Sequence, residues 1–177
     1  SSAGDLSIAA GKLVRTGAGS IEVAAGRDLL FGSGTTAVAP GEIYVAGRKV
    51  ANQASVLSTL FGSQTAKPAF TEQGGRLALA AGRDIRASES TQLINNWFWR
   101  SGLAANATQY STASQLAWWT EFSRFRQTVG AFGGGGLHVE AGRDIVNLQA
   151  MVPTAGWADS RLMAEATLQR VGGGDLE

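Results

Sequence analysis

The chain has 177 residues, enough for one domain with a sizeable core. A formal net charge of +1 and 16% charged residues exclude the clustered basic excess of nucleic-acid-binding domains, so we expect no nucleic-acid partner. The absence of cysteine excludes disulfides and thiolate metal sites, and we expect no cofactor. No stretch matches a membrane helix or a signal peptide. If the protein is exported, we expect its export signal to lie outside this segment.

One short phrase returns five times along the chain. Each copy begins with aliphatic residues two apart, the spacing of a strand that sends alternate side chains to one face. A small-residue step leads to a glycine, and in most copies an aliphatic residue follows three positions later. This pattern predicts strand, corner, strand. The copies are Leu6–Gly11, Ile21–Leu29, Ile43–Val50, Leu77–Ile85 and Leu137–Ile145.

The corners of these phrases lack the Asn-Gly and Asp-Gly pairs that favour two-residue hairpin turns. Self-similar units that cannot bury a face alone are typical of solenoids, in which they stack around one continuous core. The phrases therefore predict an all-β solenoid rather than a set of hairpins. Its structural corner residues are Gly11, Gly26, Gly47, Gly82 and Gly142, together with Asp28, Asp84 and Asp144.

The repeat is dense from residue 4 to about residue 50. We place strands there near Leu6–Ala9, Leu13–Arg15, Ile21–Ala24, Leu29–Phe31, Thr36–Val38 and Ile43–Ala46. The pattern then loosens over a first insertion at about 51–74, which contains Pro68 and reads mainly as a protruding loop.

A second insertion, at about 88–136, is rich in tryptophan. Trp118, Phe122, Phe125 and Val129 follow helical spacing, which predicts a helix that begins near Ser111 or Thr112 and ends at Gly130. The segment Leu93–Arg100 fits a short helix or a buried strand. After the fifth phrase we expect strands near 148–152, 161–164 and 166–169. Both ends of the sequence read as repeat openings, which indicates one segment, 1–177, of a longer solenoid.

The phrase resembles the repeat of filamentous-haemagglutinin-type exoproteins, the secreted partners of bacterial two-partner secretion systems. The likeness is strongest over 118–122, 129–145 and 152–154, where tryptophans, a glycine run, the fifth phrase and Val-Pro-Thr succeed one another. The resemblance implies a right-handed single-stranded parallel β-helix. It also implies export through an outer-membrane β-barrel transporter and a place outside the cell, secreted or at its surface.

The function that follows is a shaft or distal segment of a surface-exposed exoprotein that mediates adhesion, aggregation or biofilm matrix formation. Its partners would be a glycan or protein on a host or bacterial surface, or a second copy of itself. Two alternatives are the stem of a contact-dependent toxin-delivery exoprotein and a self-assembling extracellular filament. A β-helix enzyme that acts on polysaccharides is a weaker alternative, because no carboxylate pair stands out, and we expect no enzyme.

The repeated Arg-Asp pairs at the corners could line up along one edge of the solenoid. One aspartate per corner, with an arginine beside it, supplies too few oxygens for calcium. We therefore expect these carboxylates to accept backbone hydrogen bonds while the arginines offset their charge. The single histidine, His138, falls on the outward side of a predicted strand, and no nucleophile motif accompanies it.

The aromatic residues of the second insertion allow two interpretations. They could form a binding platform for a sugar or protein, because aromatic faces stack on apolar surfaces and attract cations. They could instead form a packed cover over the flank of the solenoid, which the shared face of the predicted helix favours. The candidate platform residues are Trp97, Trp99, Arg100, Trp118, Trp119, Arg124 and Arg126.

Overall fold

The computed structural model describes residues 4–35, 37–51, 69–101, 117–158 and 168–177, and for Trp99, Ser101 and Ala158 the backbone alone. The described chain is all-β. Its helical residues are two single 3-10 turns, η1 (Ile94–Asn96) and η2 (Phe122–Arg124). No helix in the described ranges is long and apolar enough to cross a membrane.

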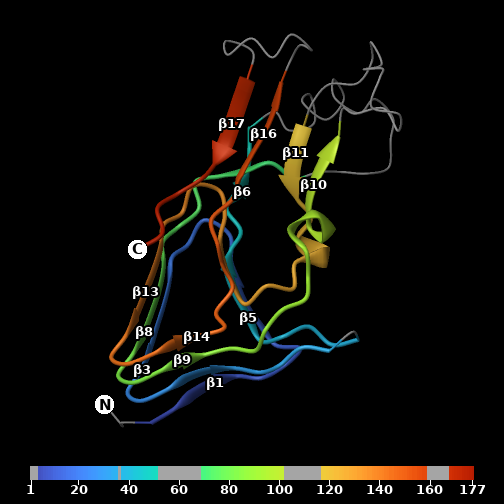
Figure 1. Cartoon of the computed structure of the whole chain (residues 1–177). Helices are drawn as coiled ribbons and strands as arrows, with labels where there is room; N and C mark the ends of the chain where they lie inside the picture. Colours follow the sequence, from blue (N-terminus) through green and yellow to red (C-terminus); the bar gives the residue numbers. More distant parts are fainter. Residues whose placement is uncertain (1–3, 36, 52–68, 102–116, 159–167) are drawn as a thin grey trace.

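Three parallel sheets form the larger part of the molecule (Figure 1). Neighbouring strands in each sheet come from distant parts of the sequence, and they pair in register, as Leu29 does with Ile85 and Ile85 with Ile145. Sheet A contains β1 (Leu6–Ile8), β4 (Leu29–Phe31), β9 (Ile85–Arg86) and β14 (Ile145–Val146), in that order. Sheet B contains β2 (Leu13–Thr16), β5 (Glu42–Val45), β12 (Val129–Ala131) and β15 (Ala150–Met151). Sheet C contains β3 (Ile21–Ala25), β8 (Leu77–Ala81) and β13 (Leu137–Ala141).

The main core lies between the three parallel sheets, and each sheet contributes alternate residues to it. Leu77 and Leu79 of β8 are fully buried, whereas Ala78 between them faces outward and is only partly covered. This is the period-2 burial that the spacing of the aliphatic residues predicts. Figure 1 shows β3, β8 and β13 along one side of this core, β1, β9 and β14 along its base, and β5 on the third side.

Two antiparallel sheets complete the fold. Sheet D pairs β6 (Arg48–Lys49) with β7 (Thr71–Glu72), and sheet E has the order β10 (Phe98–Ser101), β11 (Ala117–Thr120), β16 (Thr154–Ala158), β17 (Leu168–Gly172). In Figure 1 sheet E projects away from the base formed by sheet A. A second apolar cluster joins sheets D and E; it contains Val50, Phe70, Ala117, Trp119, Ala155 and Trp157.

The predicted corner glycines meet their backbone requirement in two ways. Gly11 and Gly47 have φ of 71° and 77°, in the left-handed region that favours glycine. Gly82 and Gly142 are instead needed for close approach. A Cβ on Gly142 would lie 2.3 Å from the carbonyl oxygen of Gly82, and a Cβ on Gly82 would lie equally close to that of Gly26.

The prediction of a helix that ends at Gly130 is wrong over the described residues. Trp118 and Trp119 lie in β11, where strand pairing to Arg100 and Trp99 of β10 places them on opposite faces, and Val129 begins β12 of sheet B. The helical spacing arose by coincidence, because these residues pack in different places: Phe122 and Phe125 lie in one aromatic cluster and Val129 lies in the main core. The proposed helix start, Ser111 or Thr112, lies outside the described residues.

Two smaller predictions also change. The strand expected at Thr36–Val38 is a loop over the described residues there, because the Thr35 hydroxyl accepts hydrogen bonds from the amides of Ala37 and Val38 and closes a turn. The segment that fitted either helix or strand contains both, as η1 followed by β10.

Candidate functional site

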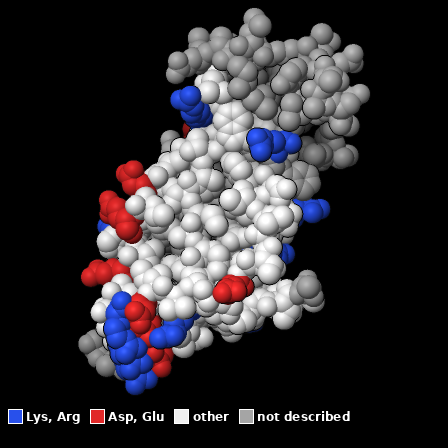
Figure 2. All heavy atoms as spheres, viewed as in Figure 1, with Lys and Arg blue, Asp and Glu red and all other residues white. Residues whose placement is uncertain are grey.

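A ladder of arginine and aspartate side chains runs along the edge where sheets C and A meet. Arg27 donates to Asp5 from Nε and Nη2 at 3.0 and 2.8 Å. Arg83 does the same to Asp28 at 3.0 and 2.5 Å, and Arg143 to Asp84 at 2.9 and 2.6 Å. Figure 2 shows these opposite charges gathered at one corner of a face that is otherwise mostly uncharged.

Each of these carboxylates also accepts a hydrogen bond from a backbone amide, that of the aspartate which follows its arginine partner. The amide of Asp28 donates to Asp5, that of Asp84 to Asp28, and that of Asp144 to Asp84. The hydrogen bonds from arginine hold the pKa of Asp84 well below its usual range and lower the pKa of Asp28, because they stabilise the ionised form. These interactions occupy Asp28 and Asp84, and within the described ranges no group of three His, Asp or Glu side chains is placed to hold a metal ion.

An aromatic cover lies on the outer face of sheet B. It contains Tyr44, Trp97, Phe122, Phe125 and Phe132, which with Ala46, Phe98 and Met151 form one apolar cluster. Tyr44 stacks on Phe122 with ring centroids 5.7 Å apart, and Trp97 meets Phe125 edge to face at 5.0 Å. Such offset and edge-to-face contacts are the preferred geometries of aromatic pairs.

The structure separates the residues of the predicted aromatic platform. Trp97 lies in the aromatic cover and is 1% exposed, and Trp119 is buried in the cluster between sheets D and E. Trp118 is half-buried, and its indole nitrogen donates to the carbonyl of Thr154. Arg100 and Arg124 are exposed, on β10 and η2. Because the two buried rings offer no open face, the interpretation as a cover accounts for Trp97 and Trp119.

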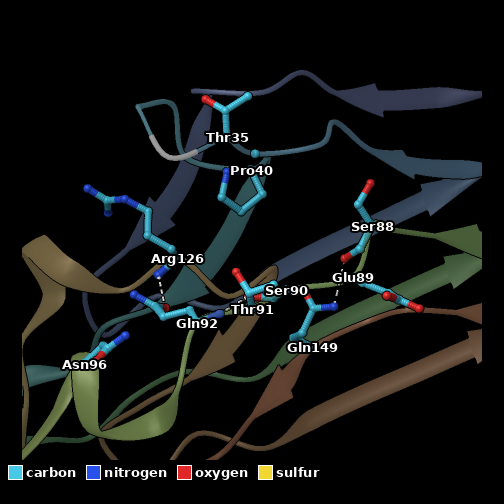
Figure 3. A pocket seen from close by; sticks show the side chains of 11 residues that line it. Thr35, Pro40, Ser88, Glu89, Ser90, Thr91, Gln92, Asn96, Arg126 and Gln149 are labelled. Carbon is cyan, nitrogen blue, oxygen red and sulfur yellow. Dashed lines mark hydrogen bonds between the residues drawn. The ribbon is translucent and has the colours of Figure 1, made fainter.

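A polar groove of about 520 Å³ opens beside the aromatic cover, at the edge between sheets A and B (Figure 3). It lies between the loop that carries Thr35 and Pro40 and the segment after β9, which carries Ser88 to Gln92. Asn96, Arg126 and Gln149 complete the lining together with Gly34. Arg126 is the member of the predicted platform that lines this groove.

Gln92 fixes one wall of the groove to the chain that precedes β12. Its side-chain nitrogen donates to the carbonyl of Arg124 at 2.6 Å, and its side-chain oxygen accepts from the amide of Arg126 and the side chain of Gln127. Gln149 fixes the other end of the same wall, because it donates to the carbonyl of Ser88 at 2.9 Å and accepts from the Thr128 hydroxyl at 2.6 Å. The two glutamines thus hold the wall formed by residues 88–92 in place.

Arg126 of the groove and Glu42 on β5 influence each other electrostatically and have few partners among the described residues. The Arg126 guanidinium donates to the carbonyl of Phe125 and forms no salt bridge with a described carboxylate. Glu42 on β5 is buried, and its Oε1 atom has no hydrogen-bond partner among the described residues. Burial raises the pKa of Glu42 to about 7, and the positive charge of Arg126 opposes that rise.

His138 lies on the outer side of β13, where the alternation along the strand predicts it. Its ring nitrogens lie 3.8 Å from Glu140 and 3.5 Å from Glu177, and it lines a smaller groove of about 290 Å³ over sheet C.

The sequence reading did not single out Gln92, Gln149 or the Ser-Glu-Ser-Thr run at 88–91. A signal was present, since four short polar residues and a glutamine directly after an aliphatic strand are unusual in this repeat. Comparisons with protein-family models, with curated proteins and with solved structures give no match, so the site rests on its own geometry.

Proposed function

We propose that the chain is a right-handed, single-stranded parallel β-helix that forms a shaft or distal segment of a secreted, surface-exposed bacterial exoprotein. The observation that carries this proposal is the order in which the chain visits the parallel sheets. Strands β1, β2 and β3 belong to sheets A, B and C, and β4, β5 and β8 repeat that order, as do β9, β12 and β13. Strands β14 and β15 begin a fourth passage through A and B.

Such a coil converts chain length into reach. Each passage adds one strand spacing of about 4.8 Å along the axis. Sheets D and E arise from chain that leaves this order between β5 and β8, between β9 and β12, and after β15. The stacked strands thus form the scaffold. The segments that leave the stack form additional surface, including the aromatic cover beside the groove.

The adhesive contact is assigned to the polar groove. Its hydroxyl and amide groups both donate and accept hydrogen bonds, which suits the hydroxyl groups of a surface glycan. Arg126 adds a cation that forms no salt bridge with a described carboxylate, and Glu89 adds an exposed carboxylate. Export through an outer-membrane β-barrel partner, adhesion, aggregation and biofilm formation belong to the same proposal and rest on the resemblance of the repeated phrase.

Engineered cysteine pairs test the coil, because the chain has no cysteine of its own. Glu22 faces Ala78, and Ala24 faces Ala80, across β3 and β8, with Glu22 and Ala24 exposed on the outer face. Parallel neighbours about 4.8 Å apart are within disulfide reach. The pairs 22–78 and 24–80 should oxidise readily, whereas the offset pairs 22–80 and 24–78 should not. An antiparallel arrangement would reverse this result.

A further pair extends the test to the next passage. Ala78 also faces His138 across β8 and β13, so cysteines at 78 and 138 should oxidise as well. Peptide mapping by mass spectrometry identifies each disulfide. If 22–78 forms but 78–138 does not, the continuous stack is wrong even though one strand pair is right.

Adhesion is tested with the fluorescently labelled chain on bacterial cells, host cells and a glycan array. The amount of chain retained on these surfaces should fall for the variants Arg126→Ala and Gln92→Ala. Arg100→Ala, at an exposed position on β10, is the matched control. Equal retention of all three variants would remove the groove from the proposal. If the chain bound none of these surfaces, the adhesive role would be wrong and only the role of a spacer would be left.

A further inference from the structure

The buried carboxyl group of Glu42 on β5 lies next to the chain that lines the polar groove. Val129 pairs with Ile43 in sheet B and both enter the main core, so Thr128 and Glu42 are neighbours on the outer face of that sheet. The Thr128 hydroxyl donates to Gln149 and is therefore not available to the carboxyl group. Glu42 is 5% exposed, and its Oε1 atom has no hydrogen-bond partner among the described residues. Ionisation of this group is costly, because neither water nor a donor stabilises the charge on that oxygen.

Arg126 connects this buried carboxyl group to the groove. It lies two residues before Thr128 and lines the groove, and its positive charge opposes the rise in the pKa of Glu42 that burial causes. Its side chain is exposed, and within the described chain the guanidinium donates to one group, the carbonyl of Phe125. Since a guanidinium has five N–H groups, others remain to bind a ligand. One cation thus faces both the buried carboxyl group and the contents of the groove.

The elements around Glu42 carry several other charged side chains. These are Lys12 and Arg15 at β2, Glu121 and Arg124 at η2, and Glu89, which Figure 3 shows on the other side of the groove from Arg126. Among the described charges, that of Arg126 is the one that acts on the pKa of Glu42. Tyr44 titrates on the same face of β5; burial above all, and Glu42 to a smaller extent, raise its pKa above 10.0. The Tyr44 hydroxyl therefore stays protonated near neutral pH.

We propose that Arg126 binds the carboxylate of an acidic sugar in the groove, and that Glu42 weakens this contact when it becomes ionised. The proposal rests on the proposed function, because it specifies the ligand of the same groove. While Glu42 is protonated, the guanidinium can bind the sugar carboxylate with two parallel hydrogen bonds. Once Glu42 is ionised, its charge attracts the guanidinium and repels the carboxylate. An acidic sugar therefore favours the protonated form of Glu42, so its affinity falls as the pH rises through the pKa of that group, about 7.

The binding test uses trigalacturonate as the probe and its methyl ester as the neutral sugar of matched shape. Calorimetry with the full chain should show an affinity for trigalacturonate that is about fivefold lower at pH 8 than at pH 5.5. Sugar carboxyl groups are ionised throughout this range, so the change comes from the protein. The methyl ester should bind more weakly, with the same affinity at both pH values. Equal affinities for the two sugars, or no binding of trigalacturonate, would overturn the proposal.

Substitutions separate the two roles. Glu42→Gln keeps the shape of the side chain but cannot ionise, so its affinity for trigalacturonate should stay at the pH 5.5 level up to pH 8. Arg126→Ala should lower the affinity at pH 5.5 about tenfold, whereas Arg126→Lys should lose less and keep the pH dependence, because it retains the charge. Arg100→Ala, exposed on β10 and not part of the groove lining, is the matched control and should follow the natural chain. An unchanged pH dependence in Glu42→Gln would overturn the role of Glu42.

A titration without ligand tests the link between the two residues by itself. The carboxyl carbon of Glu42 can be followed by NMR as the pH rises, and Arg126→Ala should raise its midpoint, because the charge of Arg126 opposes the effect of burial. Equal midpoints in the two chains would overturn the proposal. The surface-retention experiment keeps the two proposals distinct. If Gln92→Ala lowers retention while trigalacturonate and its methyl ester bind alike, the choice of an acidic sugar fails and adhesion through the groove stands.

Discussion

Arg143 binds Asp84, 59 positions earlier in the sequence, with Nε on one carboxylate oxygen at 2.9 Å and Nη2 on the other at 2.6 Å. Arg86 donates to the same carboxylate. The backbone amide of Asp84 donates to the Asp28 carboxylate, and the Asp84 carboxylate accepts from the amide of Asp144. Asp84 thus links the segments that carry Asp28 and Asp144 to its own.

Asp84→Asn should lower the stability of the chain at neutral pH, because it removes the charge that Arg143 and Arg86 share. The pKa of Asp84 is lowered in the folded state, so its contribution is present above the ordinary pKa of 3.8 and is lost as the pH falls toward the folded value. Urea unfolding of both chains should show a difference at pH 7 that shrinks below pH 4. Asp144→Asn is the control and should change little, because no described arginine donates to the Asp144 carboxylate.

Gly135→Ala should destabilise the fold by roughly 1–3 kcal/mol, the usual range for overpacking. Its Cβ would lie 2.2 Å from the carbonyl oxygen of Gly75, a backbone atom that cannot move aside. The adjacent Gly136 is the matched control, because its Cβ would have no neighbour closer than 3.7 Å. Thermal unfolding of the two alanine variants measures the contrast, and equal midpoints would contradict close stacking at this corner.

Phe125→Ala should cost about 3–5 kcal/mol, the usual range for loss of a buried aromatic side chain. Phe125 is fully buried and contacts Tyr44, Trp97 and Phe132. Leu93→Ala, at a position 65% exposed, should be nearly neutral. Chemical unfolding followed by tryptophan fluorescence provides the comparison, and a neutral Phe125→Ala would show that the aromatic cover adds nothing to the fold.

Glu42→Gln should remove a loss of stability that occurs as the pH rises. Burial raises the pKa of Glu42 from 4.5 to about 7, so the folded state retains a proton that the unfolded state releases between these values. The natural chain therefore loses stability through that window, by roughly 3 kcal/mol at most. Glutamine keeps the shape without the charge, and the variant should gain on the natural chain from pH 5 to pH 8. Parallel pH profiles of the two chains would refute the prediction.

The sequence by itself determined the all-β class, most strands of the three parallel sheets, and the need for glycine at the corners. The alternation of Leu77 and Leu79 and the position of Gly82 can be read from the sequence, because the strand period and the backbone freedom of glycine depend only on adjacent residues. The sequence predicted only that each arginine offsets the charge of the aspartate beside it. It did not predict the ion pair between Arg143 and Asp84, because a single phrase does not show which arginine reaches which aspartate.

Tertiary structure alone decided the second insertion and the groove. Trp118 and Phe125 have the spacing of a helix, but pairing with β10 and β16 satisfies the backbone of β11, and the partners lie about 20 and 40 residues away along the chain. The groove joins Thr35, Gln92 and Gln149 from three separate segments. Only the stacking of distant strands sets the distance between such segments, because that distance depends on the register of the sheets rather than on any local pattern.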